Sequence, residues 1–296
     1  MSRGVVLSVW ASVLFAGLYY LASLLKPLTG LEVFGWRISI TLPCLMLYMS
    51  VTGGWVKVFE ILQRVKSSPL LALGLLASSL MMGVQLWLFL WAPAVGRGLN
   101  VSLGYFLLPL CMIVAGRLLF AERLTRFQLV AACCALVGVL NEVLVIGALA
   151  WETWLVAIGY TVYFSFRRFL KTNNVGGMWF DMALLLPAAL YFLYTGAPIV
   201  ERFVQNPDLY IWVPLMGLVS AVALICYLIA NRLLSLGLFG LLSYLEPSLL
   251  VLVSLALGER IAPQEWATYI PIWLAVFILV AEGARHVWRQ RTIRTE

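Results

Sequence analysis

Four ionisable side chains stand inside long apolar stretches of the sequence, where their chemistry would be most pronounced. They are Arg37, Glu142, Asp181 and Glu246. An ionised group at the centre of a bilayer costs about 2.5–3.5 kcal/mol on insertion scales, so it normally faces a cavity or a charged partner. Each of the four could contact a charged substrate, or it could join an internal ion pair. Glu246, Asp181 and Glu142 are also the candidates for carrying a coupled proton.

Glu246 lies in a segment that concentrates polar groups beside a proline. Ser243, Tyr244 and Glu246 supply a hydroxyl, a phenol and a carboxylate next to Pro247. Because proline has no N–H, Pro247 would free the carbonyl of Ser243, which must then find another partner. The segment predicts a kinked helix with a substrate-binding surface, although a proline alone can mark an ordinary bend. Kinks are also predicted at Pro43, Pro109 and Pro187.

Several aromatic side chains lie near these polar groups and could stack on a substrate or hold a cation. The substrate-binding candidates of this kind are Trp36, Trp91, Tyr105, Trp179 and Tyr244. Core packing is the competing interpretation for each of them.

Two Glu-Arg pairs follow the apolar stretches that contain Pro109 and Pro247. They are Glu122-Arg123 and Glu259-Arg260. Both pairs stand at the ends of predicted membrane spans. We interpret them as helix caps or as charges that close gates on opposite faces of the membrane.

The sequence contains no motif of a known catalytic or metal centre. Walker A, HExxH, GxSxG and paired acidic motifs are all missing. The five cysteines lie in apolar stretches without metal-ligand spacing. We therefore expect no enzyme, no catalytic residue, no metal and no cofactor.

Transmembrane helices are the elements that must position these residues. Of the 296 residues, 63% are hydrophobic and only 11% are charged, and the mean hydropathy is +0.99. Such a composition cannot cover a water-facing surface, whereas apolar runs of about 20 residues can span a bilayer as helices. We predict an all-α integral membrane protein, with the lipid bilayer as its surroundings and no nucleic-acid partner. The ten predicted spans cover residues 4–25, 31–52, 70–92, 97–116, 127–147, 151–170, 178–196, 209–230, 236–257 and 265–284.

The basic residues predict the orientation, because positively charged loops stay in the cytoplasm. With both termini in the cytoplasm, most Lys and Arg residues fall on the cytoplasmic side, including those of the tail at residues 285–296. The opposite side then receives Lys26, Arg97, Arg202 and Arg260.

The chain is predicted to contain two related halves. In each, an aromatic residue precedes a proline, an apolar run follows, and a Glu-Arg pair closes the segment. With five spans in residues 1–147 and five in residues 148–284, the second half enters the membrane upside down relative to the first. Inverted repeats of this kind are a transporter architecture, with a substrate site near the midplane of the bilayer.

Longer segments resemble a known family. They read LEVFGWRISI, FLWAPAVGRGLNVSLGYFLLPL, FAERLTRFQLVAACCALVGVL and ANRLLSLGLFGLLSYLEPSLLVLVSLALGE. They are similar to the RarD-like branch of the EamA family, in the drug/metabolite transporter superfamily, along nearly the whole chain. The resemblance implies a ten-helix fold with inverted repeats and export across the bacterial inner membrane, without an ATP-binding component. The chain departs from this branch at Trp36, where a histidine is frequent, and at Pro93, where an asparagine is common.

Together these features predict a secondary exporter of a small amphipathic or zwitterionic metabolite, or of a drug. Arg37 would meet a carboxylate of this small-molecule substrate, Glu246 an amine or an exchanged proton, and the aromatic residues its carbon skeleton. An amino-acid derivative, such as an opine-type metallophore, would fit a site of mixed charge. Two alternatives remain open: a metabolite uptake permease, and a membrane-embedded enzyme that acts on lipid or isoprenoid substrates.

Overall fold

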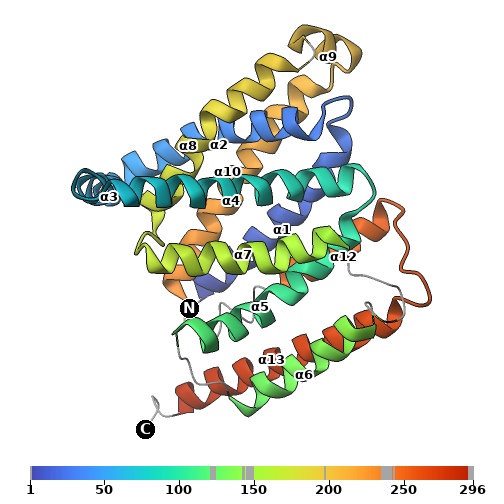
Figure 1. The fold of residues 1–296 in the computed structure, drawn as a ribbon. Coiled ribbons are helices and arrows are strands. Elements are labelled where there is room, and N and C mark those ends of the chain that lie inside the picture. Colours follow the sequence, from blue (N-terminus) through green and yellow to red (C-terminus); the bar gives the residue numbers. More distant parts are fainter. Residues whose placement is uncertain are drawn as a thin grey trace. The chain divides into compact units, whose positions relative to one another are not determined.

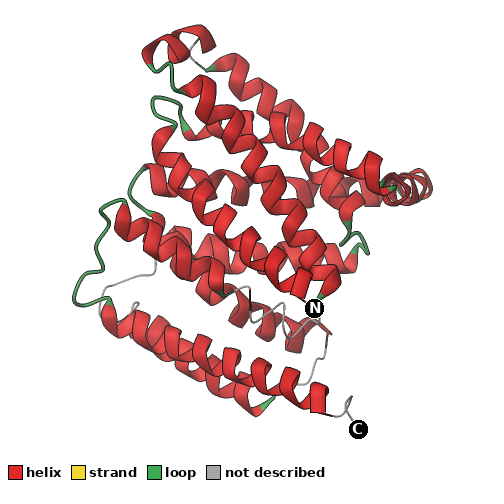
Figure 2. Ribbon diagram, turned by 180° about the vertical axis from the view of Figure 1, so that it is seen from behind, coloured by secondary structure: helices red, strands yellow, loops and turns green. Residues whose placement is uncertain are grey.

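The computed structural model describes residues 2–120, 125–141, 144, 150–196, 198–234, 242 and 244–292. This part of the chain is almost entirely helical and contains no strand (Figure 2). Its helices are α1 (Ser2–Leu24), α2 (Gly30–Thr52), α3 (Trp55–Ser67), α4 (Pro69–Ala94), α5 (Gly98–Phe120), α6 (Arg126–Asn141), α7 (Trp151–Phe169), α8 (Val175–Thr195), α9 (Ile199–Gln205), α10 (Leu209–Leu233), α12 (Leu245–Ala256) and α13 (Trp266–Thr292).

The described helices fit a membrane protein, and the predicted all-α class is confirmed for them. Each of the ten predicted spans overlaps one of these helices. Among the described residues, α1, α2, α4, α5, α8 and α10 are long and apolar enough to cross a bilayer. Shorter apolar stretches lie in α6, α12 and α13.

Two further helices, α3 and α9, lie between the predicted spans. In α3, Val58 and Ile61 are buried while Lys57, Arg64 and Lys66 are exposed. A helix with one apolar face is less apolar on average than a membrane span, so a search for long apolar runs does not detect it. The short helix α9 buries only Phe203.

The chain forms two compact units. Unit 1 comprises Met1–Val13, Gly96–Thr161 and Ile229–Glu296, and unit 2 comprises Leu14–Val95 and Val162–Leu228. Each unit therefore combines segments from both halves of the sequence. The division into repeats at residues 147 and 148 stays a prediction.

In unit 1, α6 and α13 lie side by side (Figure 1). Gly138 of α6 approaches α13 so closely that an added Cβ would lie 2.7 Å from the carbonyl oxygen of Thr268. The Nδ2 of Asn141 donates a hydrogen bond to the Thr268 hydroxyl over 3.1 Å. In a bilayer, apolar side chains are surrounded by hydrocarbon whether or not the helices associate, so burying them does not drive association. Close packing at small residues and hydrogen bonds between helices hold the helices together instead.

In unit 2, α2 packs along α8 (Figure 1). Gly35 makes the close approach, since a Cβ there would lie 2.8 Å from the carbonyl oxygen of Ala189. The α2 helix starts at a capping box, in which Thr29 and Glu32 bond each other's backbone N–H. Glu32 also contacts Arg202 of α9, with Oε1 3.4 Å from Nε. The start of α2 is therefore held both by its own cap and by a distant segment of the chain.

Close packing between α5 and α7 leads to a first prediction about stability. An added Cβ at Gly104 would lie 2.6 Å from the Cβ of Val156 and 2.8 Å from the carbonyl oxygen of Thr153. We expect Gly104→Ala to lower the free energy of unfolding by about 1–3 kcal/mol, because the helices must move apart. Denaturant titration of the protein in detergent measures this change.

Gly17→Ala is the matched control, because Gly17 also lies within a membrane helix and nothing surrounds its Cβ position within 4 Å. Alanine favours the helical backbone over glycine by about 0.5–1 kcal/mol, so this variant should be slightly more stable. Equal effects of the two substitutions would contradict the predicted close packing.

Candidate functional site

Asp181 of α8 is the centre of a buried polar cluster in unit 2. Its Oδ1 accepts hydrogen bonds from the hydroxyls of Ser78 and Ser79 on α4, over 3.1 and 3.2 Å. Its Oδ2 accepts a hydrogen bond of 2.7 Å from the hydroxyl of Tyr163 on α7. Arg167 of α7 completes the cluster with an ion pair of 3.2 Å to Oδ2. Four side chains from two other helices thus surround one carboxylate, which we call the Asp181 cluster.

Arg167 also holds the turn that joins α7 to α8. Its guanidinium donates to the carbonyl oxygen of Gly177 over 2.9 Å and to that of Thr172. Gly177 has no side chain, and an added Cβ there would collide with the guanidinium and with the Thr172 carbonyl. The pair is almost completely shielded, with side-chain exposures of 2% for Arg167 and 1% for Asp181.

Of the two interpretations offered for Asp181, a substrate contact or an internal ion pair, the structure shows the ion pair. Removing two charges from water costs several kcal/mol per ion, and only good geometry with further hydrogen bonds offsets that cost. Both oxygens of Asp181 have such partners. Arg167, the partner of Asp181, is not among the predicted site residues. Arg167 follows Tyr160 by seven residues and Tyr163 by four. Residues at these spacings share one helix face, so the sequence pattern could have located it.

Arg37 of α2 joins three helices of unit 2. Its Nε donates to the hydroxyl of Ser220 on α10 over 2.9 Å, and its Nη1 donates to the carbonyl oxygen of Leu86 on α4 over 3.1 Å. Its guanidinium lies 5.5 Å from the ring centroid of Phe89. Arg37 is only 2% exposed, so these contacts keep its charge solvated inside the helix bundle.

Three aromatic candidates of unit 2 pack against other rings. Trp36 lies 6.0 Å from Phe203, Trp91 stacks on Trp87 at 5.1 Å, and Trp179 meets Trp55 edge-on at 5.7 Å. These distances join ring centroids and are typical of packed aromatic pairs. The indole Nε1 of Trp179 is nevertheless buried and has no hydrogen-bond partner among the described residues.

The other candidates belong to unit 1. The hydroxyls of Tyr105 and Tyr160 lie 3.2 Å apart, and their rings are 5.6 Å apart. Tyr244 is 7% exposed, and its hydroxyl lacks a hydrogen-bond partner in the described part of the chain. A buried phenol without a partner needs an explanation, and a bound polar group is one.

Glu246 and Pro247 lie in the first turn of α12, where Glu246 is partly buried. The first four N–H groups of a helix have no partner within it, so a proline at this position breaks no hydrogen bond of α12. The kink predicted at Pro247 involves Ser243, which lies outside the described residues, so it stays a prediction. Pro43, Pro109 and Pro187 do lie inside helices, in α2, α5 and α8 respectively.

Glu259 caps α5 rather than the helix that precedes it. Its two carboxylate oxygens accept hydrogen bonds from the N–H groups of Gly98 and Leu99, over 2.7 and 2.8 Å. A carboxylate at a helix N-terminus satisfies unpaired donors and interacts favourably with the helix dipole. Burial raises the pKa of Glu259, while the two N–H donors oppose this shift. The adjacent Arg260 is exposed.

A second ion pair lies beside this cap and was not predicted. Nη1 of Arg97 is 2.6 Å from Oε1 of Glu152, which is fully buried at the start of α7. The hydroxyl of Thr153 donates to the carbonyl oxygen of Asn100 over 2.8 Å. The starts of α5 and α7 are therefore tied together by polar contacts.

The predicted substrate residues divide between the two units. Trp36, Arg37, Trp91, Trp179 and Asp181 belong to unit 2, and Tyr105, Tyr244 and Glu246 belong to unit 1. Four other predicted site residues lie outside the described residues: Glu122, Arg123, Glu142 and Ser243.

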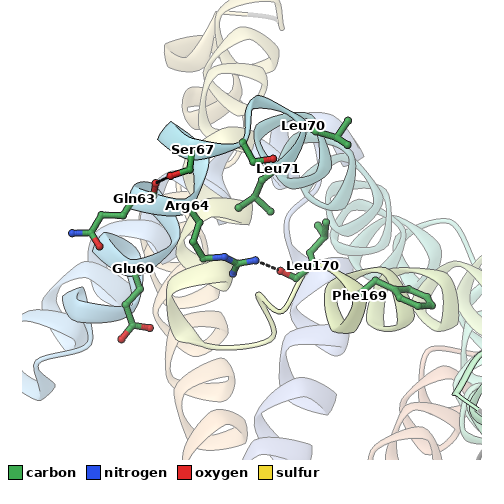
Figure 3. A pocket seen from close by; sticks show the side chains of 9 residues that line it. Glu60, Gln63, Arg64, Ser67, Leu70, Leu71, Phe169 and Leu170 are labelled. Atoms are coloured by element: carbon green, nitrogen blue, oxygen red, sulfur yellow. Dashed lines mark hydrogen bonds between the residues drawn. The ribbon is translucent and has the colours of Figure 1, made fainter.

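A pocket in unit 2, where α3 meets α4, is lined by none of the predicted substrate residues (Figure 3). Within the described part of the chain, no three His, Cys, Asp or Glu side chains are grouped to hold a metal ion.

Comparison with known proteins shows similarity along almost the whole chain. The chain is 41% identical over 289 residues to the chloramphenicol-sensitive protein RarD of Pseudomonas aeruginosa, with 97% of each chain covered. It is 40% identical over 284 residues to an uncharacterized transporter of Pasteurella multocida, covering 96% of this chain and 97% of that one. Protein RarD of Escherichia coli is 28% identical over 255 residues, which is 85% of either chain.

The fold is similar to that of a crystal structure, with a TM-score of 0.61 over 96% of this chain and 99% of that chain, at 18% sequence identity. No family model matches the chain.

The Asp181 cluster generates a second prediction. We expect Asp181→Asn to lower the free energy of unfolding by about 3–5 kcal/mol, because it leaves the charge of Arg167 buried without a counter-charge. Denaturant titration in detergent would measure the loss. Asp208→Asn is the matched control, since Asp208 is exposed, and it should change stability by about 0.5 kcal/mol or less. A similar small effect at both positions would show that the ion pair is not required.

Proposed function

Because the chain belongs to the RarD-like family of transporters, we propose that it moves a small organic solute across the bacterial inner membrane by alternating access. The observation that carries this proposal is the similarity to RarD and other transporters over at least 96% of this chain. The apolar helices are consistent with it, since six of those described are suited to cross a bilayer. Several of the relatives are named as transporters. The direction of transport and the substrate are our proposals.

The proposed architecture has ten spans in two inverted repeats of five. It is supported by the helices that overlap all ten predicted spans and by the sequence pattern shared around Pro109 and Pro247. In this arrangement α3 and α9 lie outside the spans. Transporters built from inverted repeats place the substrate near the midplane, between the repeats.

The proposed orientation puts both termini in the cytoplasm, and the distribution of charge in unit 2 supports it. The α2 helix is about 34 Å long, which is enough to cross the hydrocarbon layer. Arg202, assigned to the outer side, contacts Glu32 at the start of α2. Arg64, assigned to the cytoplasmic side, lies on α3 beyond the other end of α2 and binds the carbonyl oxygen of Lys171. Residues assigned to the same side thus lie together.

The proposed substrate is a small amphipathic or zwitterionic metabolite, such as an amino-acid derivative. A buried donor in each unit supports a polar ligand: the Tyr244 hydroxyl in unit 1 and, separately, the Trp179 indole N–H in unit 2 lack a partner among the described residues. Leaving such a donor unpaired costs about 1–3 kcal/mol, which a bound polar group would recover. An opine-type metallophore is the most specific substrate that we propose.

Within this proposal Asp181 stabilises the helix bundle, and Glu246 is the residue that carries a coupled proton. Asp181 already has hydroxyl and guanidinium partners at both oxygens. Glu246 is partly buried in the first turn of a short helix, where a carboxylate can exchange protons with water as access alternates. The aromatic residues Trp91 and Tyr105 would contact the carbon skeleton of the substrate.

Metabolite profiling tests the direction of transport. Cells that lack the protein should accumulate its substrate internally and release less of it than cells that express it. An uptake permease would give the opposite result, with a smaller internal pool in its absence. Equal pools for every small metabolite would contradict the proposed function.

The role of Glu246 can be tested in proteoliposomes with the substrate identified by profiling. We expect Glu246→Gln to reduce transport driven by a pH gradient at least about tenfold, which corresponds to roughly 1.4 kcal/mol of lost coupling. Glu201→Gln is the control, because Glu201 lies in the first turn of the short helix α9 and is exposed. Unchanged transport and pH dependence in Glu246→Gln would exclude the proton role.

A further inference from the structure

A pocket of about 770 Å³ lies where α3 meets the start of α4 and the end of α7 (Figure 3). We call it the α3–α4 pocket. One part of its lining is polar and includes Arg64, Ser67 and Ser68. The other part is apolar and includes Leu70 and Phe169. A ligand that fills this pocket must therefore be amphipathic.

The polar part favours an anion. Arg64 donates to the carbonyl oxygen of Leu170 over 2.8 Å (Figure 3). It also donates to the carbonyl oxygen of Lys171 over 3.2 Å. These two hydrogen bonds leave other N–H groups of its five-donor guanidinium for a ligand. The carboxylate of Glu60 also lines the pocket, but Lys57 balances its charge at 2.8 Å.

Further donors and positive charges lie close to Arg64. Ser68 precedes the first turn of α4, and its hydroxyl makes no capping hydrogen bond. Lys66 and Lys171 are exposed and adjoin lining residues in the chain. The rim is therefore net positive, which attracts phosphate groups at a membrane surface.

The apolar part continues along α4. Leu70 is 75% exposed, and exposed residues follow it at intervals of three or four along the helix: Leu73, Leu76, Leu80 and Val84. Such a spacing places them on one face. On a helix suited to span the bilayer, an exposed apolar face of this length is the surface that meets hydrocarbon chains. The α3–α4 pocket thus lies at the polar end of a lipid-facing surface.

We propose that the α3–α4 pocket binds an anionic phospholipid, with the phosphate at Arg64 and Ser68 and an acyl chain along Leu70 and the exposed face of α4. The net positive rim selects an anionic head group over a zwitterionic one. Because Arg64 also holds the carbonyl oxygens at the end of α7, the bound lipid would stabilise the turn between α7 and α8. This site is separate from the residues proposed for transport.

Native mass spectrometry of the full-length protein, released from detergent with equimolar phosphatidylglycerol and phosphatidylcholine, tests the proposal. The wild type should retain phosphatidylglycerol in preference to phosphatidylcholine. Leu70→Asp should weaken that retention about fivefold, the effect expected for one unit of charge near a membrane surface. An aspartate in the first turn favours the helix dipole, so this variant should fold normally.

Ile211→Asp is the matched control. Ile211 is 64% exposed and lies in the first turn of α10, outside the α3–α4 pocket. The Ile211→Asp variant should leave the retention of phosphatidylglycerol unchanged.

Arg64→Gln is a second test variant, and it should also weaken the retention of phosphatidylglycerol. Unfolding temperatures of all the variants show whether each of them is folded.

Three results would overturn the proposal. The first is equal retention of the two lipids by the wild type. The second is retention of phosphatidylglycerol by folded Leu70→Asp at the wild-type level. The third is full displacement of the lipid by millimolar inorganic phosphate, which would identify a site for a soluble anion.

Discussion

The ion pair between Arg167 and Asp181 is the constraint on which the rest of unit 2 depends. A carboxylate and a guanidinium that are both withdrawn from water lose several kcal/mol of solvation each, and they remain charged only if the fold replaces the lost water. Here the replacement comes from hydroxyls on α4 and α7 and from carbonyl oxygens in the turn before α8. The positions of three helices are therefore linked to the solvation of one pair of charges.

The same requirement explains the structure of the turn between α7 and α8. Lys171 adopts a left-handed conformation with a φ of 52°, which is unfavourable for a residue with a side chain. Arg64 binds the carbonyl oxygens of Leu170 and Lys171, and Arg167 binds those of Thr172 and Gly177. Two arginines from different helices thus satisfy the carbonyl groups of this turn, and glycine at position 177 provides the necessary space.

In unit 1, polar groups at the start of α5 likewise need partners from distant segments. The N–H groups of Gly98 and Leu99 have no partner within the helix, and the carboxylate of Glu259 binds both. The neighbouring Arg97 neutralises Glu152. Segments from both halves of the sequence thereby meet, although neither the cap nor the ion pair can be inferred from adjacent residues. In both units, polar groups at helix ends and inside the bundle determine which helices must be neighbours.

The membrane class and the helices were predictable because they depend on local composition. Apolar runs of sufficient length are helical in a bilayer whatever their neighbours are, since each backbone group is satisfied within its own segment. This explains why every predicted span overlaps a described helix. It also explains why α3 was missed, because an amphipathic helix depends on packing against α4 and α8 and has no long apolar run.

The sequence by itself determined that this is an all-helical membrane protein, and it identified the unusual charged residues in the apolar segments. Only the tertiary structure decided what those residues contact. Asp181 could equally have faced a substrate, and Arg167 could have remained at the membrane surface. Their pairing joins α7 and α8 through side chains 14 residues apart, and serines from α4 complete it. Such contacts depend on how the helices pack, because a buried charge takes whichever partners the surrounding helices bring within hydrogen-bonding distance.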